Sequence, residues 1–193
     1  MDETNRLLLA AFRRRSWLTL LHAPAGTTTS WRAILAFIAV LASVPASVDA
    51  AERMALAIAE FDFSDTSEEV TDQSREHAAR LQLFGSTLQS VLSTNNSIEI
   101  VQLTCPAGEC TGRTAGLKAL SQRAKDAGAR YLLIGEIKKM STLVGQVKFA
   151  VLDLTTSKSV CDRFLSYRGD SDEAWRRAAV FAANDIPKKC LPE

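Results

Sequence analysis

The chain has 193 residues, 47% of them hydrophobic and 23% charged, and its formal net charge at pH 7 is +1. This balance is typical of a globular domain and excludes a disordered chain, which needs low hydrophobicity and a high net charge. It also excludes a strongly basic surface, so nucleic acid is not an expected partner.

The N-terminal part of the sequence has the pattern of a signal peptide. It is basic, with arginines at positions 6, 13, 14, 15 and 32, and it contains the apolar run AILAFIAVLASVPA at positions 33–46. This run is shorter than the roughly 20 apolar residues that a membrane-spanning helix needs. We predict cleavage after Ala50, with Ala46 as the second choice. An uncleaved anchor is the alternative.

Cleavage after Ala50 would divide the chain into a signal peptide, 1–50, and one periplasmic domain, 51–193, with no stable membrane insertion. Residues 1–50 hold five Lys/Arg and three Asp/Glu, so residues 51–193 keep 18 Lys/Arg and 19 Asp/Glu. The slightly negative domain again disfavours nucleic acid and anionic membranes as partners.

Hydrophobic patterning along this domain predicts five strands and three helices. The strands show apolar runs or alternation, and the helices show apolar residues at three- and four-residue steps. The predicted strands are 54–63, 97–103, 130–140, 142–154 and 159–169, and the predicted helices are 74–93, 117–127 and 170–186, the last one ended by Pro187.

The element order β-α-β-α-β-β-β-α predicts the fold class. We expect a single α/β domain with a mixed sheet of about five strands. The first two helices connect parallel strands, and such crossovers are right-handed. The last three strands form an antiparallel meander.

All four cysteines, Cys105, Cys110, Cys161 and Cys190, follow the predicted leader. An even number of cysteines in an oxidising compartment predicts two disulfides, although four cysteines allow three pairings. We favour Cys105–Cys110, which is local, together with Cys161–Cys190, which would hold the C-terminal tail. Four residues separate the first two cysteines, whereas a redox pair is usually a CxxC motif.

The domain lacks a recognisable catalytic motif. His77 is its one histidine, so no second imidazole is available for a zinc site, and neither a GxSxG motif nor a phosphate-binding loop occurs. A lone histidine on a helix is usually half-exposed, which is what we expect of His77. The prediction is a non-enzymatic protein without cofactor or metal.

An acidic segment, 62–72, follows the first predicted strand. Asp62, Asp65 and Glu68 lie where open α/β sheets place ligands, and hard cations bind clustered carboxylates. The spacing does not fit an EF-hand loop, so we favour a solvated loop with helix-capping residues. The alternative function is a small-ligand or metal-binding periplasmic protein that uses these three residues.

A second candidate surface lies near the C-terminus. The segment DEAWRRA places Trp175 beside Arg176 and Arg177, and Tyr167 and Arg168 precede it. We expect Trp175 to pack in the core with the two arginines outside. Tyr167, Arg168, Arg176 and Arg177 are therefore a candidate surface patch.

Several segments together resemble a family of exported proteobacterial proteins known only as a domain of unknown function. They are ALAIAEFDFSDTS, IEIVQL, AGARYLLIGEIKKMS, VKFAVLDLTTSKSV and GDSDEAWRRA, and they cover essentially all of 54–184. More distantly the pattern is similar to the N-terminal domain of TolB and to envelope-assembly lipoproteins, whose fold is likened to anticodon-binding domains.

The resemblance implies an interaction module of the cell envelope that works through its surface and has no catalytic site. The expected partner is an unidentified envelope protein, and a homo-oligomer is left open. The expected contact elements are the loop 64–73, the cysteine loop 105–113 and the edge of the 142–167 hairpin, because exposed loops and unpaired strand edges carry contacts.

Overall fold

A computed structural model of the protein describes residues 53–192, and the predicted leader with its cleavage site lies outside the described residues. Ten elements follow one another in this range. They are β1 (Met54–Ile58), β2 (Asp62–Asp65), α1 (Ser74–Ser93), β3 (Ile98–Val101), α2 (Gly112–Ala115), α3 (Leu117–Asp126), β4 (Tyr131–Lys139), β5 (Val144–Asp153), β6 (Lys158–Arg168) and α4 (Asp172–Lys189).

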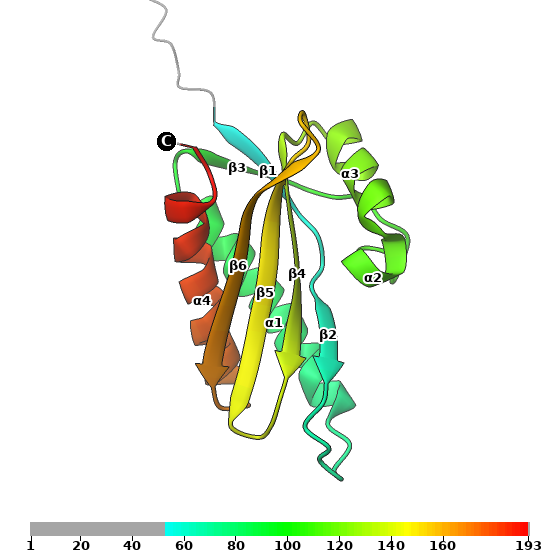
Figure 1. Cartoon of the computed structure of the whole chain (residues 1–193), viewed down its shortest axis with the longest axis vertical. Helices are drawn as coiled ribbons and strands as arrows, with labels where there is room; N and C mark the ends of the chain where they lie inside the picture. The colour runs from blue at the N-terminus through cyan, green and yellow to red at the C-terminus, as the bar shows by residue number, and fades with distance from the viewer. Residues whose placement is uncertain (1–52, 193) are drawn as a thin grey trace, which may run out of the picture. The chain divides into compact units, whose positions relative to one another are not determined.

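The strands form one mixed sheet in the order β3-β1-β4-β5-β6, with β2 pairing to β4 beyond the end of β1. Strands β1, β2 and β3 run parallel to their neighbours, whereas β4, β5 and β6 form an antiparallel meander (Figure 1). The predicted α/β fold with a mixed sheet is therefore confirmed.

The prediction of a single strand over 54–63 is wrong, because this segment forms two strands, β1 and β2. Ile58 pairs with Leu133 and Asp62 with Glu136, so β1 and β2 meet β4 in registers that differ by one residue. The extra residue is accommodated between the two strands, where the Glu60 amide donates to the carbonyl of Cys110 at 2.9 Å. Loss of register at one inserted residue is the usual effect of a bulge.

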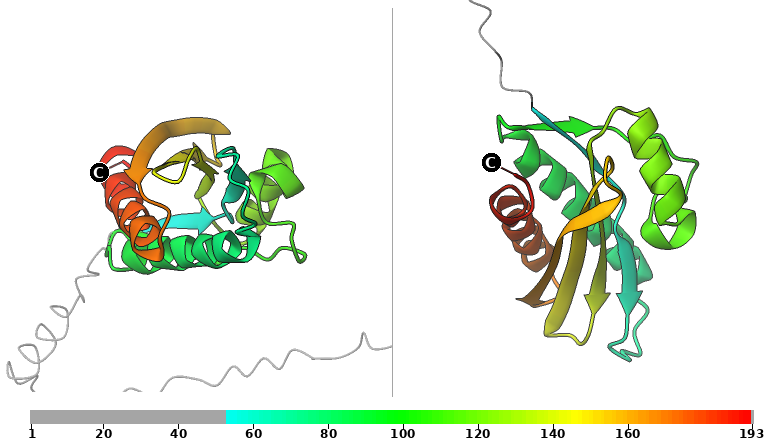
Figure 2. Two further views of the ribbon diagram at one scale, coloured as in Figure 1. Left: turned by 90° about the horizontal axis from the view of Figure 1, so that it is seen from below. Right: turned by 45° about the horizontal axis from the view of Figure 1, so that its top comes forward.

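Helices α1 and α4 cover one face of the sheet, which we call the covered face (Figure 2). The main core lies between them and the strands, because alternate residues of each strand point to the same side. Its largest fully buried members are Trp175, Phe84, Leu56, Leu88, Leu92, Leu133, Ile137, Ile186, Val147 and Val151.

Two glycines on the covered face allow aromatic rings to lie against the strands. A Cβ built on Gly135 would lie 2.3 Å from Phe61 Cε1, and one built on Gly145 would lie 2.2 Å from Tyr167 Cζ. Both distances are far below a van der Waals contact. Glycine is therefore required at each position by the ring that packs on it.

Helix α3 covers part of the opposite face of the sheet. A smaller core forms beneath it from Leu120, Ala124, Leu132, Leu152 and neighbouring residues. The rest of this face, formed by the outward residues of β4, β5 and β6, is not covered by a helix of the described domain (Figure 1). We call it the open face.

The helix ends differ from the sequence prediction in two places. Helix α4 continues to Lys189 with Pro187 inside it, although the sequence predicts that Pro187 ends the helix. The Cys190 amide still donates to the Ile186 carbonyl at 2.9 Å, since a proline in the last turn removes only its own donor. The short helix α2 was not predicted. Its N-cap Thr111 and Thr114 form a capping box.

Among residues 53–192, no helix combines the length and apolar character needed to cross a membrane.

Candidate functional site

A group of buried and half-buried polar and charged side chains lies where α1 and α4 meet the ends of β2 and β4. We call it the Asp170 cluster, and its members are Glu69, Gln73, His77, Arg80, Lys139, Asp170 and Trp175. Asp170 Oδ2 lies 2.9 Å from His77 Nε2 and 3.1 Å from Lys139 Nζ. Its Oδ1 accepts a hydrogen bond from Trp175 Nε1 at 2.9 Å and lies 3.0 Å from Arg80 Nη1. Both oxygens of Asp170 are thus held by several donors.

Lys139 provides the buried positive charge of the cluster. Its side chain is 3% exposed, and Nζ donates to Glu69 Oε2 and to Gln73 Oε1, each at 2.8 Å. Burial alone would lower the pKa of Lys139, but its bonds to Glu69 and Asp170 outweigh burial and raise the pKa. Lys139 is therefore a charged, fully paired structural group at neutral pH.

The pKa of Asp170 changes in the opposite direction to that of Lys139. Burial by itself would raise the pKa of Asp170, but hydrogen bonds from His77, Trp175 and Lys139, with the Arg80 charge, overcome it and hold the pKa at about 2. The carboxylate remains ionised at any physiological pH. The cluster therefore works as a permanent ionic junction between the β2–α1 loop, α1, β4 and α4.

His77 was expected to be half-exposed, and this prediction is wrong. The residue is 3% exposed and its ring stacks on Trp175 with centroids 6.2 Å apart. Its hydrogen-bond partner Asp170 lies 93 positions along the chain, so local sequence gives no sign of the contact. A buried polar ring needs such a partner, which explains how His77 can face the core.

The three predicted ligand residues of the acidic loop do not meet. The carboxylate of Asp62 accepts a hydrogen bond from the Arg113 amide at 2.9 Å, at the start of α2, whereas Asp65 lies 3.7 Å from Lys139 Nζ. Glu68 is exposed at a positive φ of 56°. Within residues 53–192, no group of three His, Cys, Asp or Glu side chains has an arrangement that could hold a metal ion.

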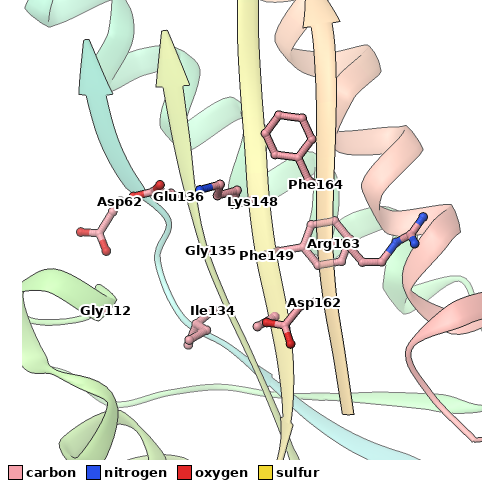
Figure 3. Close-up of a pocket in the computed structure, with 11 residues that line it drawn as sticks. Asp62, Gly112, Ile134, Gly135, Glu136, Lys148, Phe149, Asp162, Arg163 and Phe164 are labelled. Atoms are coloured by element: carbon pink, nitrogen blue, oxygen red, sulfur yellow. The ribbon is translucent and has the colours of Figure 1, made fainter. Parts of the chain in front are cut away.

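The open face carries a row of side chains that crosses four strands. Residues in register on neighbouring strands are Asp62 of β2, Glu136 of β4, Lys148 of β5 and Phe164 of β6. Figure 3 shows the four side by side, with Ile134 and Asp162 next to them. Lys148 lies between an acidic and an aromatic neighbour, and Phe164 remains 53% exposed. This row lines a shallow pocket of about 440 Å³.

Strand β6 is the edge of the sheet, and its two sets of alternate residues have different surroundings. The odd-numbered residues hold α4: Cys161 is bonded to Cys190, Arg163 Nε lies 2.9 Å from Asp185 Oδ2, and the Tyr167 ring packs edge-on against Trp175. The even-numbered residues, Asp162, Phe164, Ser166 and Arg168, are exposed.

The outer backbone of β6 is available for pairing. The Gly169 amide donates to the carbonyl of Leu143, directly opposite it, so the odd-numbered residues of β6 bond to β5 as antiparallel pairs alternate. The even-numbered residues consequently turn their N–H and C=O groups outward. No other strand of the described domain pairs with this edge.

A groove of about 400 Å³ runs between the outer edge of β6 and α4. We call it the β6–α4 groove, and it is lined by Phe164, Leu165, Ser166, Tyr167, Arg168, Ala174, Arg177, Ala178 and Phe181. Three of the four predicted patch residues, Tyr167, Arg168 and Arg177, line it. Arg176 lies beside it on α4, where it binds Glu173 at 2.7 Å.

Sequence reasoning missed the two exposed aromatic residues of this groove. Phe164 is 53% and Phe181 is 58% exposed, one on each wall. The signal for Phe164 is its position among Asp162, Ser166 and Arg168 on the polar side of an alternating strand. Phe181 lies outside the buried stripe of α4, which a helical projection of the sequence also shows.

The cysteine loop connects β3 to α2. Cys105 is bonded to Cys110, the local pairing favoured from the sequence. Arg123 of α3 donates to the Glu109 carbonyl, at 2.6 Å, so the loop is also held from the helix. This loop belongs to the α3 side of the domain.

The chain is similar to several solved structures at low sequence identity. It is similar to the PelC dodecamer protein from Paraburkholderia phytofirmans, with 14% identity and a TM-score of 0.43 over 75% of this chain and 91% of that chain. It is similar to TolB from Acinetobacter baumannii, with 12% identity and a TM-score of 0.45 over 72% of this chain and 28% of that chain. It is similar to the LpoB C-terminal domain from Salmonella enterica, with 10% identity and a TM-score of 0.36 over 62% of this chain and 85% of that chain.

No curated protein matches the chain. The family DUF3280, whose description reads "Protein of unknown function (DUF2380)", matches residues 54–186, which is more than half of the sequence. The expected resemblance to a family of unknown function is thus confirmed, and the chain belongs to this family, DUF3280.

Proposed function

We propose that this protein is a non-enzymatic binding module of the cell envelope that contacts a partner protein by strand addition at β6. The observation that carries the proposal is the free outer edge of β6 beside the β6–α4 groove. An extended segment placed there would pair with the outward backbone groups of even-numbered residues, and its side chains would alternately meet the open face and α4.

The location in the envelope is supported by the sequence. The apolar run at 33–46 after several arginines has the pattern of a signal peptide, and two disulfides are typical of exported domains. The proposal includes cleavage after Ala50 and a periplasmic domain. Mass measurement of the mature protein tests the cleavage site.

The described side chains do not favour a catalytic role. The carboxylate with the most strongly shifted pKa, Asp170, is 12% exposed and is held by four donors, which favours a structural role over substrate binding. Four of the five exposed residues of the β6–α4 groove are Phe164, Phe181, Arg168 and Arg177, and Phe and Arg are enriched at protein interfaces.

The test is site-specific photo-crosslinking in cells that export the full chain. A benzophenone amino acid at position 164 or 168 should give an adduct with a second protein, whereas the same group at Lys118, exposed on α3, should not. Ser166→Pro should abolish the adducts, because it removes an outward N–H while the bonds of β6 to β5 remain. Equal adducts from position 118, or no effect of Ser166→Pro, would contradict the proposal.

A further inference from the structure

We infer that the segment bound by the β6–α4 groove is acidic at the end beside Arg168 and apolar in its middle. This inference rests on the proposed function, and it adds the chemistry of the partner. It follows from the charges, the exposed rings and the outward backbone groups of β6 at the groove.

The charge around the groove is positive at one end. Arg168 is exposed at the end of β6, and Arg177, on the facing wall, has a side chain that is 64% exposed. Both side chains line the same groove. An extended segment that passes between them would meet one cation on each of its faces.

The acidic residues of α4, which forms the facing wall, already have cationic partners. Glu173 binds Arg176 at 2.7 Å and lies 3.8 Å from Arg177. Asp172 binds Arg80 at 3.0 Å, and Asp185 lies 2.9 Å from Arg163 and 2.8 Å from Lys189. Among the described residues Arg168 forms no ion pair, and Arg177 shares Glu173 with Arg176 at the longer distance of 3.8 Å, so both arginines can attract acidic side chains of a partner.

The middle of the groove is apolar. Phe181, Ala178 and Leu165 line it on the helix side, and Phe164 borders it on the open face. Phe164 and Phe181 are each more than half exposed, so a partner side chain between them would bury ring surface that water now contacts. Burial of such apolar surface favours association.

The spacing of the strand links these two features. We take the partner segment as antiparallel to β6, the commoner direction of pairing. Its first residue then lies opposite Arg168 and its second opposite Tyr167, on the side of Arg177. The fourth and fifth lie opposite Leu165 and Phe164. The expected segment therefore begins with two acidic residues and continues with a polar residue and two apolar residues.

A second copy of this chain fits less well. Two β6 strands paired by a two-fold axis would bring the two α4 helices together. The exposed face of each α4 carries Arg176, Arg177 and Lys188 around Val180 and Phe181. Its one carboxylate, Asp185, is already bound to Arg163 and Lys189, so mainly like charges would meet. An acidic segment of another protein has the complementary charge.

The experiment is fluorescence anisotropy with the purified full chain and a labelled heptapeptide, Glu-Glu-Thr-Leu-Val-Thr-Thr. A peptide with Lys-Lys in place of Glu-Glu is the charge control, and a peptide with N-methylated backbone at alternate residues is the pairing control. We expect saturable binding of the acidic peptide that weakens with NaCl, and at least roughly tenfold weaker binding of both controls.

Variants of the protein locate the binding. Arg168→Glu and Arg177→Glu should each weaken the acidic peptide roughly tenfold, because an attraction becomes a repulsion. Phe181→Ala and Ser166→Pro should also weaken it, whereas Arg113→Glu, the same charge change on α2, should leave binding unchanged. Circular dichroism and melting temperature check that each variant is folded.

Three results would overturn the inference. They are binding of the Lys-Lys peptide that equals binding of the acidic one, loss of binding in Arg113→Glu but not in Arg168→Glu, and no binding of any peptide. If Ser166→Pro still abolishes the crosslinks from position 164 in these cases, the proposed strand addition stands, and only the inferred acidic character of the partner segment is wrong. A dimer that Ser166→Pro dissociates, without peptide binding, would identify a second copy as the occupant.

Discussion

The two faces of the sheet use charge in different ways. On the covered face, Lys139 is buried and Asp170 is largely buried, and hydrogen bonds satisfy both. On the open face, Glu136 and Lys148 lie opposite each other in register but remain accessible to water. The same residue types thus have a structural role on one face and are free for contacts on the other.

The difference follows from desolvation. A buried ion must be paired, and removing one partner leaves an uncompensated charge that costs several kcal/mol. An exposed pair is worth about 0–1 kcal/mol, because water screens it and holding the side chains costs entropy. Substitutions on the covered face should therefore change stability, and substitutions on the open face and the β6 edge should change binding.

Trp175→Ala should give the largest loss of stability. The ring is fully buried, contacts Phe63, His77 and Tyr167, and donates to Asp170. We expect a decrease of ~3–5 kcal/mol in the free energy of unfolding, measured by urea denaturation. Trp175→Phe, which keeps a ring but loses the donor, is the matched control and should cost less. A cost below ~1 kcal/mol for the alanine variant would contradict the buried role of the ring.

Acid should cause the second-largest loss of stability, through protonation of Asp170 on the covered face. The pKa of Asp170 is about 2 in the folded protein against an ordinary 3.8, so its contribution to stability is present above pH 4 and is lost as the pH falls from about 4 to 2. We expect on the order of 2 kcal/mol from this group, measured as the free energy of unfolding against pH.

Asp170→Asn is the control for the acid experiment. The variant should be less stable at pH 7, because Lys139 and Arg80 lose a carboxylate partner. It should also show a shallower decrease between pH 4 and pH 2. An unchanged acid profile would mean that other groups control acid unfolding. Asp65 and Asp185 are examples: burial would raise the pKa of each, but hydrogen bonds and nearby cations lower it.

Lys148→Ala should have a small effect, since the side chain is exposed on the open face. We expect the free energy of unfolding to stay within about 0.5 kcal/mol of the wild-type value. Lys139→Ala, at the matched lysine of the covered face, should cost several kcal/mol in the same assay. Similar costs for the two lysines would contradict the difference between the two faces.

Calcium should have the smallest effect. Asp62, Asp65 and Glu68 point to different surroundings, and Lys139 already occupies the cationic position near Asp65. We expect no change in melting temperature at millimolar calcium, measured by differential scanning fluorimetry. A clear increase would indicate a ligand bound by the folded state, and it would revive the metal-binding alternative.

Much of the fold could be predicted from local patterns, because apolar periodicity reports which side of a strand or helix faces the core. The break between β1 and β2 could not, since it depends on the register with β4 and on the contact of Glu60 with Cys110. His77 and Asp170 were not identified as partners, because the pairing exists only after α1 and α4 pack together.

Only part of the candidate patch could be predicted, and the reason is similar. Tyr167 and Arg168 are adjacent, so they point to opposite sides of β6, and alternation alone separates them. Their common place at one groove becomes visible only when the edge of the sheet and α4 are seen together. The sequence contains the residues, whereas the strand order determines which backbone groups are left unpaired.

The attachment of β6 to α4 has a consequence for binding entropy. A disulfide, an ion pair and an aromatic contact join the two walls of the groove at Cys161, Arg163 and Tyr167. A groove whose walls are joined covalently and by packing loses little motion when a ligand enters, so the ligand bears most of the ordering cost. Reduction of Cys161–Cys190 would loosen one wall, and the affinity of this edge would then depend on the redox state of the compartment around it.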